Sequence, residues 1–264
     1  MTTIQVGPAQ KEFMVHRALL CDRSKYFAKA LTGSFEESKT GTVKLEDVST
    51  MLFRLVVSWL YTGTIVYGVS DNGPNIQSEF ADFKYGGEFD DEEINADDTS
   101  TWPKLVLVKL YVLADRLDMK VLRNDSIVAL NNALMRSKRT IHVSSLRYVS
   151  SHTTARSPLR KLIVDHLAYT AVVDLERKGF WSIVPHDITL DVLMRVGRRV
   201  PVKLCNSCYQ KGLSENKIVV DDEHPCKNED DMPFLVDICI YHEHADDAEK
   251  KACQASRDKI IKRW

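Results

Sequence analysis

The chain has 264 residues, a formal net charge of −1 at pH 7, 44% hydrophobic residues and 28% charged residues. This balanced charge provides no bulk attraction for nucleic acid or an anionic membrane surface, so we expect neither as a partner. The amino terminus has no basic segment followed by an apolar core, and no apolar run approaches the ~18 residues that a membrane span requires. Five of the six cysteines follow residue 200. That distribution is not typical of a secreted disulfide scaffold, and it favours an intracellular protein of the cytoplasm or nucleus.

The first part of the chain predicts a small sheet. Two β-prone runs, Thr2–Val6 and Lys11–Val15, flank a turn signal at Gly7 and therefore predict a hairpin. Further along, Thr42–Leu45 alternates apolar and polar residues, as expected for a half-buried strand.

Helices are predicted around these strands. Ser24 is placed to cap a helix that Gly33 ends, and Asp47 or Ser49 to cap a longer apolar helix that ends at Gly63. The apolar positions recur at helical spacing, so one face of each helix should enter a common interior. The residues expected to share that interior are Val15, Leu19, Phe27, Val57 and Leu60.

The chain contains the sequence segments VHRALL, RSKYF, GSFEES and WLYTG, in this order. Together they resemble the sequence of the BTB/POZ domain, in the version typical of fungal BTB proteins. The resemblance runs from about Thr2 to Leu134, with one interruption. It implies an α+β fold, in which a small mixed sheet is flanked by helices, and a non-catalytic role in protein–protein association. In this family a leading segment often completes a strand-swapped homodimer, and Met1 stands where that segment should be. The resemblance therefore implies homo- or hetero-association without the usual dimer lead-in.

The same resemblance points to three interaction-surface residues. Family dimers pair an early aspartate with the arginine after the VH pair; Arg17 matches the arginine, whereas the aspartate has no counterpart. The alternative for Arg17 is a solvated surface arginine. Many BTB proteins also recruit a cullin-family ubiquitin ligase scaffold through a hydrophobic-x-Glu motif, whose positions hold Phe53 and Leu55 here. A leucine cannot accept the hydrogen bonds of a carboxylate, so the cullin adaptor is the less favoured function.

The rest of the chain divides by composition. Between Glu79 and Asp98, nine acidic residues face a single lysine, and such a segment buries too little apolar surface to offset its ordering entropy. After residue 101 the apolar period is again helical, with Ser157 and Pro158 placed to start one strong helix. The predicted organisation is a first BTB/POZ part (1–68), a flexible acidic insertion (69–101), closing BTB/POZ helices (102–136), a helical extension (137–200) and a cysteine- and histidine-containing tail (201–264).

The tail contains the residues with the clearest chemical potential. Pairs of thiolate and imidazole ligands with two residues between them are typical of zinc sites, because the turn between them brings both donors to one tetrahedral ion. Cys205-x-x-Cys208 and Cys239-x-x-His242 have this spacing and are the candidate ligands. The alternative is that the cysteines pack as small apolar residues without metal. The whole constellation consists of Cys205, Cys208, His224, Cys226, Cys239, His242, His244 and Cys253.

Catalysis is not expected. The sequence contains no GxGxxG, GxxxxGK[ST], GxSxG or HExxH pattern, which are the motifs of common cofactor, phosphate, nucleophile and metalloprotease sites. Two functions therefore stay open. The first is a protein–protein interaction module without a cofactor, acting as an adaptor or regulator. The second is a zinc-containing regulatory protein, linked to transcription or chromatin, whose functional end is the tail.

Overall fold

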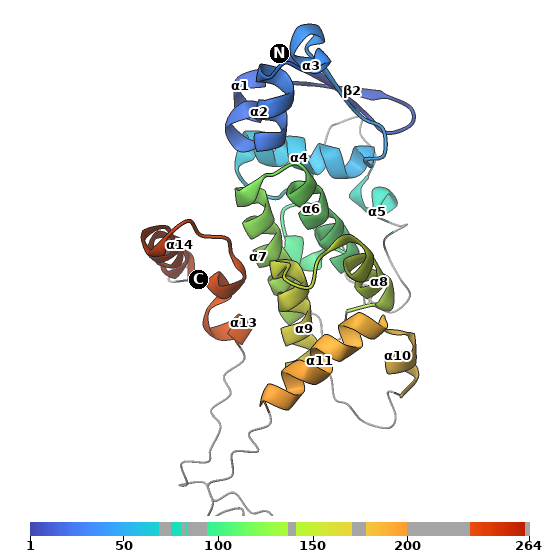
Figure 1. Ribbon diagram of the computed structural model, residues 1–264, viewed down its shortest axis with the longest axis vertical. Helices are drawn as coiled ribbons and strands as arrows, with labels where there is room; N and C mark the ends of the chain where they lie inside the picture. Colours follow the sequence, from blue (N-terminus) through green and yellow to red (C-terminus); the bar gives the residue numbers. More distant parts are fainter. Residues whose placement is uncertain are drawn as a thin grey trace, which may run out of the picture.

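The computed structural model describes residues 1–68, 75–80, 83, 94–136, 141–170, 178–199 and 233–261. Figure 1 shows an elongated molecule with a small sheet at one end and helices stacked along its length. No helix within these ranges is long and apolar enough to cross a bilayer. The strands are β1 (Thr2–Val6), β2 (Lys11–Val15) and β3 (Thr42–Leu45), and the helices are α1 (Arg17–Arg23), α2 (Lys25–Thr32), α3 (Glu36–Thr40), α4 (Thr50–Thr62), α5 (Ile76–Glu79), η2 (Thr99–Thr101), α6 (Lys104–Arg116), α7 (Lys120–Arg136), α8 (Val143–His152), α9 (Pro158–Thr170), α10 (Lys178–Ile183), α11 (His186–Arg199), α13 (Pro233–Val236), η4 (Ile238–Tyr241) and α14 (Asp247–Ile261).

The sheet is mixed, as predicted. Its strand order is β2-β1-β3, with β1 antiparallel to β2 and parallel to β3. In the register, Ile4 of β1 lies opposite Phe13 on one side and Val43 on the other. Gly7 turns the hairpin in the left-handed region, at φ +75°, a conformation that glycine adopts without strain. Alternate residues of each strand face the helices, so the sheet has one buried face and one exposed face.

The predicted capping residues lie at helix ends. The Ser24 hydroxyl accepts a hydrogen bond from the Phe27 N–H at the start of α2 and donates one to the Leu117 carbonyl oxygen, 2.5 Å away. Gly33 ends α2 and Gly63 ends α4. Ser49 is the N-cap residue of α4, although its side chain makes no capping hydrogen bond.

The predicted interior forms around α4 and the closing helices. Val15, Phe27 and Leu60 are buried in one apolar core, and Leu19 and Val57 pack against it. Helix α6 is buried on nearly all sides by α4, α7 and α8. A hydrogen bond from Trp59 Nε1 to Asp125 Oδ2, 2.8 Å long, joins α4 to α7.

The segment predicted as a flexible insertion is packed where the structure describes it. Phe80 is fully buried, and its ring contacts those of Tyr67 and Trp102 at centroid distances of 5.7 and 5.2 Å. Glu79 accepts hydrogen bonds from Tyr67 and Arg54, 2.7 and 2.6 Å long. The expectation of a solvated linker is therefore wrong for residues 75–80 and 94–101, because their few apolar side chains enter the core.

The helical extension packs beyond α7, as predicted. Arg160 of α9 is almost fully buried and forms ion pairs with Asp187 and Asp191 of α11, both 2.6 Å long. Asp165 of α9 accepts a hydrogen bond from the Tyr241 hydroxyl of η4, 2.8 Å away. These contacts hold α11 and the tail against α9.

Phe80→Ala tests whether the insertion is part of the core. Removing a buried ring leaves a cavity, so we expect the free energy of unfolding to fall by about 3–5 kcal/mol. Urea denaturation followed by circular dichroism measures the loss. Ser78→Ala, on the exposed side of the short helix α5 that Phe80 follows, is the control and should change stability by less than about 0.5 kcal/mol. Equal stabilities of the two variants would support the linker interpretation.

His166 should make stability depend on pH. Its imidazole is buried and stacks on Phe234 at a centroid distance of 3.9 Å. Burial, with a smaller effect from the nearby Lys104 charge, lowers the pKa of His166 from 6.5 to about 4. The unfolded chain therefore binds this proton at a higher pH than the folded chain, and the free energy of unfolding should decrease as pH falls from 6.5 to about 4, by about 2–3 kcal/mol.

Urea denaturation of the wild type and His166→Gln over this pH range isolates the contribution, because the other titrating groups are common to both proteins. The difference in unfolding free energy between them should change with falling pH in favour of the variant. Parallel pH profiles would contradict the assignment.

Candidate functional site

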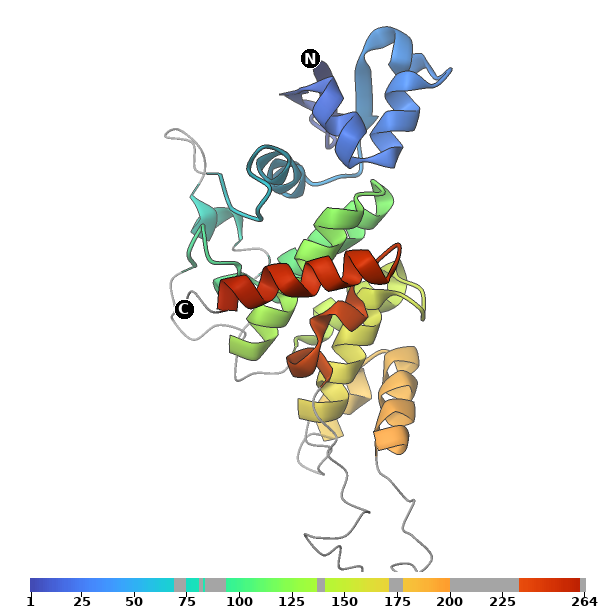
Figure 2. The ribbon, with the colours of Figure 1, turned by 90° about the vertical axis from the view of Figure 1, so that its left-hand side faces the viewer.

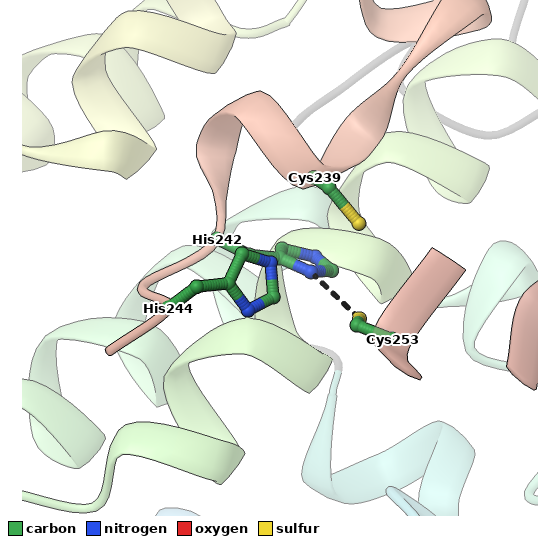
Figure 3. Close-up of side chains that lie close together, drawn as sticks. All are labelled: Cys239, His242, His244 and Cys253. Atoms are coloured by element: carbon green, nitrogen blue, oxygen red, sulfur yellow. Dashed lines mark hydrogen bonds between the residues drawn. The ribbon is translucent and has the colours of Figure 1, made fainter. Parts of the chain in front are cut away.

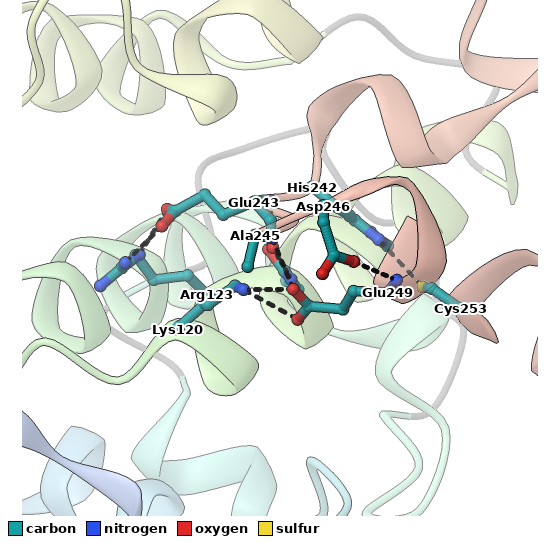
Figure 4. A network of polar contacts seen from close by, with 9 residues as sticks. Lys120, Arg123, His242, Glu243, Ala245, Asp246, Glu249 and Cys253 are labelled. Atoms are coloured by element: carbon teal, nitrogen blue, oxygen red, sulfur yellow. Dashed lines mark hydrogen bonds and ion pairs between the residues drawn. The ribbon is translucent and has the colours of Figure 1, made fainter. Parts of the chain in front are cut away.

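The tail is attached to α7 by a cluster of polar contacts, shown in Figure 4. Arg123, whose side chain is only 8% exposed, donates from Nε and Nη2 to both carboxylate oxygens of Glu243, at 2.6 and 2.5 Å. The Asn124 side chain forms two hydrogen bonds with the backbone of Glu243: it accepts one from the N–H at 3.0 Å and donates one to the carbonyl oxygen at 3.3 Å. Bidentate contacts of this kind fix orientation as well as position.

A second contact positions the start of α14. The Lys120 ammonium lies 2.8 and 2.9 Å from the two carboxylate oxygens of Glu249 and holds the pKa of that carboxyl below its usual value. Asp246 caps the helix by accepting from the Glu249 N–H at 2.7 Å, and Glu249 in turn accepts from the Ala245 N–H at 2.5 Å. Figure 2 shows the resulting placement of α14 beside α7.

Four potential metal ligands gather beside these two contacts (Figure 4). The ligand atoms of Cys239, His242, His244 and Cys253 all lie within 4.8 Å of one another. The Cys253 Sγ is 3.5 Å from the His242 Nδ1, and the two imidazole rings meet edge to face with centroids 5.7 Å apart. Figure 3 shows that the four side chains converge from η4, the segment that follows it, and α14. Cys239 is buried and the other three are partly buried.

The structure brings together half of the predicted ligand set. Cys239 and His242 meet, whereas Cys205 and Cys208 lie outside the described residues. His244 and Cys253, which lie with them in the structure, belong to the same constellation but are not part of the predicted ligand pairs. His244 could have been identified from the sequence, because it follows His242 by two residues in the same segment. Cys253 follows His242 by eleven residues and lies on a helix, and no local spacing rule identifies it as a ligand.

Two of the three predicted interaction-surface residues are not on the surface. Phe53 is fully buried, with its ring 5.1 Å from that of Phe13, and Leu55 is 1% exposed. The prediction is wrong for both because α4 lies between the sheet and α6 and is covered on both sides. Arg17 is exposed, and its guanidinium donates to the Leu31 carbonyl oxygen near the end of α2.

Other apolar side chains are exposed instead. Met14, on β2, is 65% exposed, and Met194, on α11, is 58% exposed. The exposed large apolar side chains are Met1, Met14, Phe35, Tyr61, Val121, Met135, Ile183, Leu190, Leu193 and Met194.

Comparison with known proteins gives the class of the first part of the chain. Residues 2–78 match the BTB/POZ domain family. The chain is also 33% identical over 77 residues to Kelch repeat and BTB domain-containing protein 4 of Homo sapiens, of Mus musculus and of Pongo abelii. The match covers 26% of this chain and 14–15% of those relatives, so the chain spans only a small part of their length.

The match agrees with the fold. The chain contains a BTB/POZ domain, with a small mixed sheet flanked by helices, followed by a helical carboxy-terminal region. BTB/POZ domains mediate protein–protein association. The relatives named here are animal proteins.

Glu243→Gln tests whether the Arg123 contact holds the tail. The change keeps the shape of the side chain but removes the nearest of three carboxylate charges around a buried guanidinium, the others being Asp115 at 3.7 Å and Asp118 at 3.5 Å. We expect the free energy of local opening of residues 237–254 to fall by about 1.5–3 kcal/mol, measured by hydrogen exchange. Lys120→Gln breaks the exposed pair and should have a smaller effect. Equal exchange in Glu243→Gln and wild type would contradict this role for Arg123.

Proposed function

We propose that this protein is a non-catalytic protein–protein interaction module, whose BTB/POZ domain associates with another BTB domain in a second copy of the chain or in a different protein. The observation that supports it most directly is the family match over residues 2–78, which coincides with the sheet and its flanking helices. The word set resembling fungal BTB proteins supports placement in that group, and an intracellular setting in the cytoplasm or nucleus is consistent with an adaptor or regulatory role.

The outer edge of β2 is the surface we assign to this association. β2 ends the strand order, so one of its edges carries no strand among the described residues. Such an edge presents backbone N–H and C=O groups that can pair with a strand of another chain. Met14 adds an exposed apolar side chain at the same place. Backbone pairing and a desolvated methionine together would supply both register and affinity.

The other candidate functions have different support. A cullin adaptor is less favoured, because Leu55 replaces the family's glutamate and is buried where a partner could not reach it. A zinc-containing regulatory protein is favoured by one observation, the gathering of four ligand side chains in the tail. Its link to transcription or chromatin has no support of its own among the described residues.

Met14→Glu tests the proposed surface. A charge placed in an apolar contact should cost about 1.4 kcal/mol or more, which is about tenfold in the dissociation constant. Light scattering coupled to size exclusion, over a concentration series, measures the midpoint of self-association. We expect the wild type to gain mass with concentration and the variant to do so only at higher concentration.

Met194→Glu is the matched control, since it makes the same change at a similarly exposed methionine of α11. Its association midpoint should equal that of the wild type. A wild type that stays monomeric throughout would contradict self-association, and a midpoint shifted by Met194→Glu alone would place the contact on the helical extension.

A further inference from the structure

We propose that Cys239, His242, His244 and Cys253 bind one Zn²⁺ ion, which fastens α14 to η4 as a closed structural site. This inference is independent of the proposed association through the BTB/POZ domain. The proposed ligand set differs from the set that spacing alone favours. Cys239 and His242 belong to both sets, whereas His244 and Cys253 take the place of Cys205 and Cys208.

Local backbone structure brings the first two ligands together. Asp237 caps η4 by accepting a hydrogen bond from the Cys239 N–H at 2.9 Å, and the His242 N–H donates to the Cys239 carbonyl oxygen at 3.2 Å. The tight turn so formed places a thiol and an imidazole three residues apart on the same side of the chain. Paired ligands of zinc sites have this arrangement.

An extended backbone supplies the third ligand. His242 has φ −95° and ψ 152°, and successive side chains of an extended segment point to opposite sides. Glu243 therefore points to α7, where Arg123 binds it, while His242 and His244 both point to the cluster. The Arg123 contact thus sets the direction of both imidazoles. Cys253 closes the set from α14, whose first turn Lys120 and Asp246 hold in place.

The environment of His244 points to a bound metal ion. Both of its ring nitrogens are buried, and neither has a hydrogen-bond partner among the described residues. Burying an unsatisfied polar atom costs about 1–3 kcal/mol, so native proteins rarely leave such a group without a role. Coordination through one ring nitrogen would satisfy it. Apolar packing of the cysteines, or a simple contact between Cys253 and His242, leaves His244 unexplained.

The donor set and its spacing fit zinc. Two thiolates and two imidazoles form the Cys₂His₂ set of closed tetrahedral sites, which leaves no open position for catalysis. With Zn–S about 2.3 Å and Zn–N about 2.0–2.1 Å, neighbouring ligand atoms of a tetrahedron lie about 3.3–3.8 Å apart. The 3.5 Å between Cys253 Sγ and His242 Nδ1 is within that range. Small rotations of the other side chains suffice, because all four atoms already lie within 4.8 Å of one another.

Cobalt substitution and metal analysis of the full-length protein test the site. The chain is purified, saturated with Zn²⁺, desalted and assayed for bound metal; in parallel, the metal-free chain is titrated with Co²⁺, whose visible absorption reports tetrahedral thiolate coordination. We expect about one zinc per chain and a cobalt spectrum of the two-thiolate, two-imidazole type. Both should be lost in the double variant His244→Asn, Cys253→Ser.

The matched control is Cys205→Ser, Cys208→Ser, which removes the pair that spacing favours. It should retain the zinc and the cobalt spectrum, as should Cys21→Ser, at a cysteine remote from the cluster. Loss of metal from the Cys205 and Cys208 variant, or retention by the His244 and Cys253 variant, would overturn the proposal. If the latter variant does not fold, the wild-type spectrum still decides: a chain that takes up no Co²⁺, or gives a four-thiolate spectrum, would refute the site.

Discussion

The rest of the structure depends on the enclosure of α6. This helix is apolar around nearly its whole circumference, and even Lys104 at its start is 1% exposed. A helix without a polar face cannot lie on the surface of a protein, because the exposed apolar area would cost free energy in proportion to its size. The helix is therefore covered from several sides, by α4 of the BTB/POZ domain on one side and by α7 and α8 on the others. The sheet and the helical extension are thus parts of one core, although they lie far apart in the sequence.

Helix α7 connects this core to α9 and to the tail. Its polar residues are distributed along its length so that each contacts a different neighbour: Asp125 accepts from Trp59 of α4, Arg123 binds Glu243 of the tail, and Asn131 donates to the Phe234 carbonyl oxygen. The proposed zinc ion would make the tail rigid, since it joins η4 to α14, which are otherwise linked through the contacts of Asp237 with Gln254 and Lys250.

The sequence predicts the strands and helices well, because an apolar period of two or 3.6 residues is a local signal, and burial of the apolar face in the core stabilises the same structure. It fails where the decisive contact is not local. Acidic composition, averaged over residues 69–101, concealed the few apolar side chains that reach the core, Ile76, Phe80 and Ile94. The apolar period of α4 predicts one buried face, but not the burial of Leu55, which the family resemblance places on an interaction surface. In the tail, the spacing of Cys239 and His242 identified two candidate ligands correctly as neighbours, whereas Cys253 reaches the cluster only because α14 folds back beside α7.

Hydrogen exchange of the full-length protein, followed by mass spectrometry at increasing urea, tests the enclosure of α6 most directly. If α6 joins the BTB/POZ domain and the extension into one core, the amides of α4, α6 and α9 should open with the same free energy and the same dependence on urea. Exchange of α6 and α9 under conditions in which α4 and the sheet stay protected would contradict the account, because it would show two separate folding units.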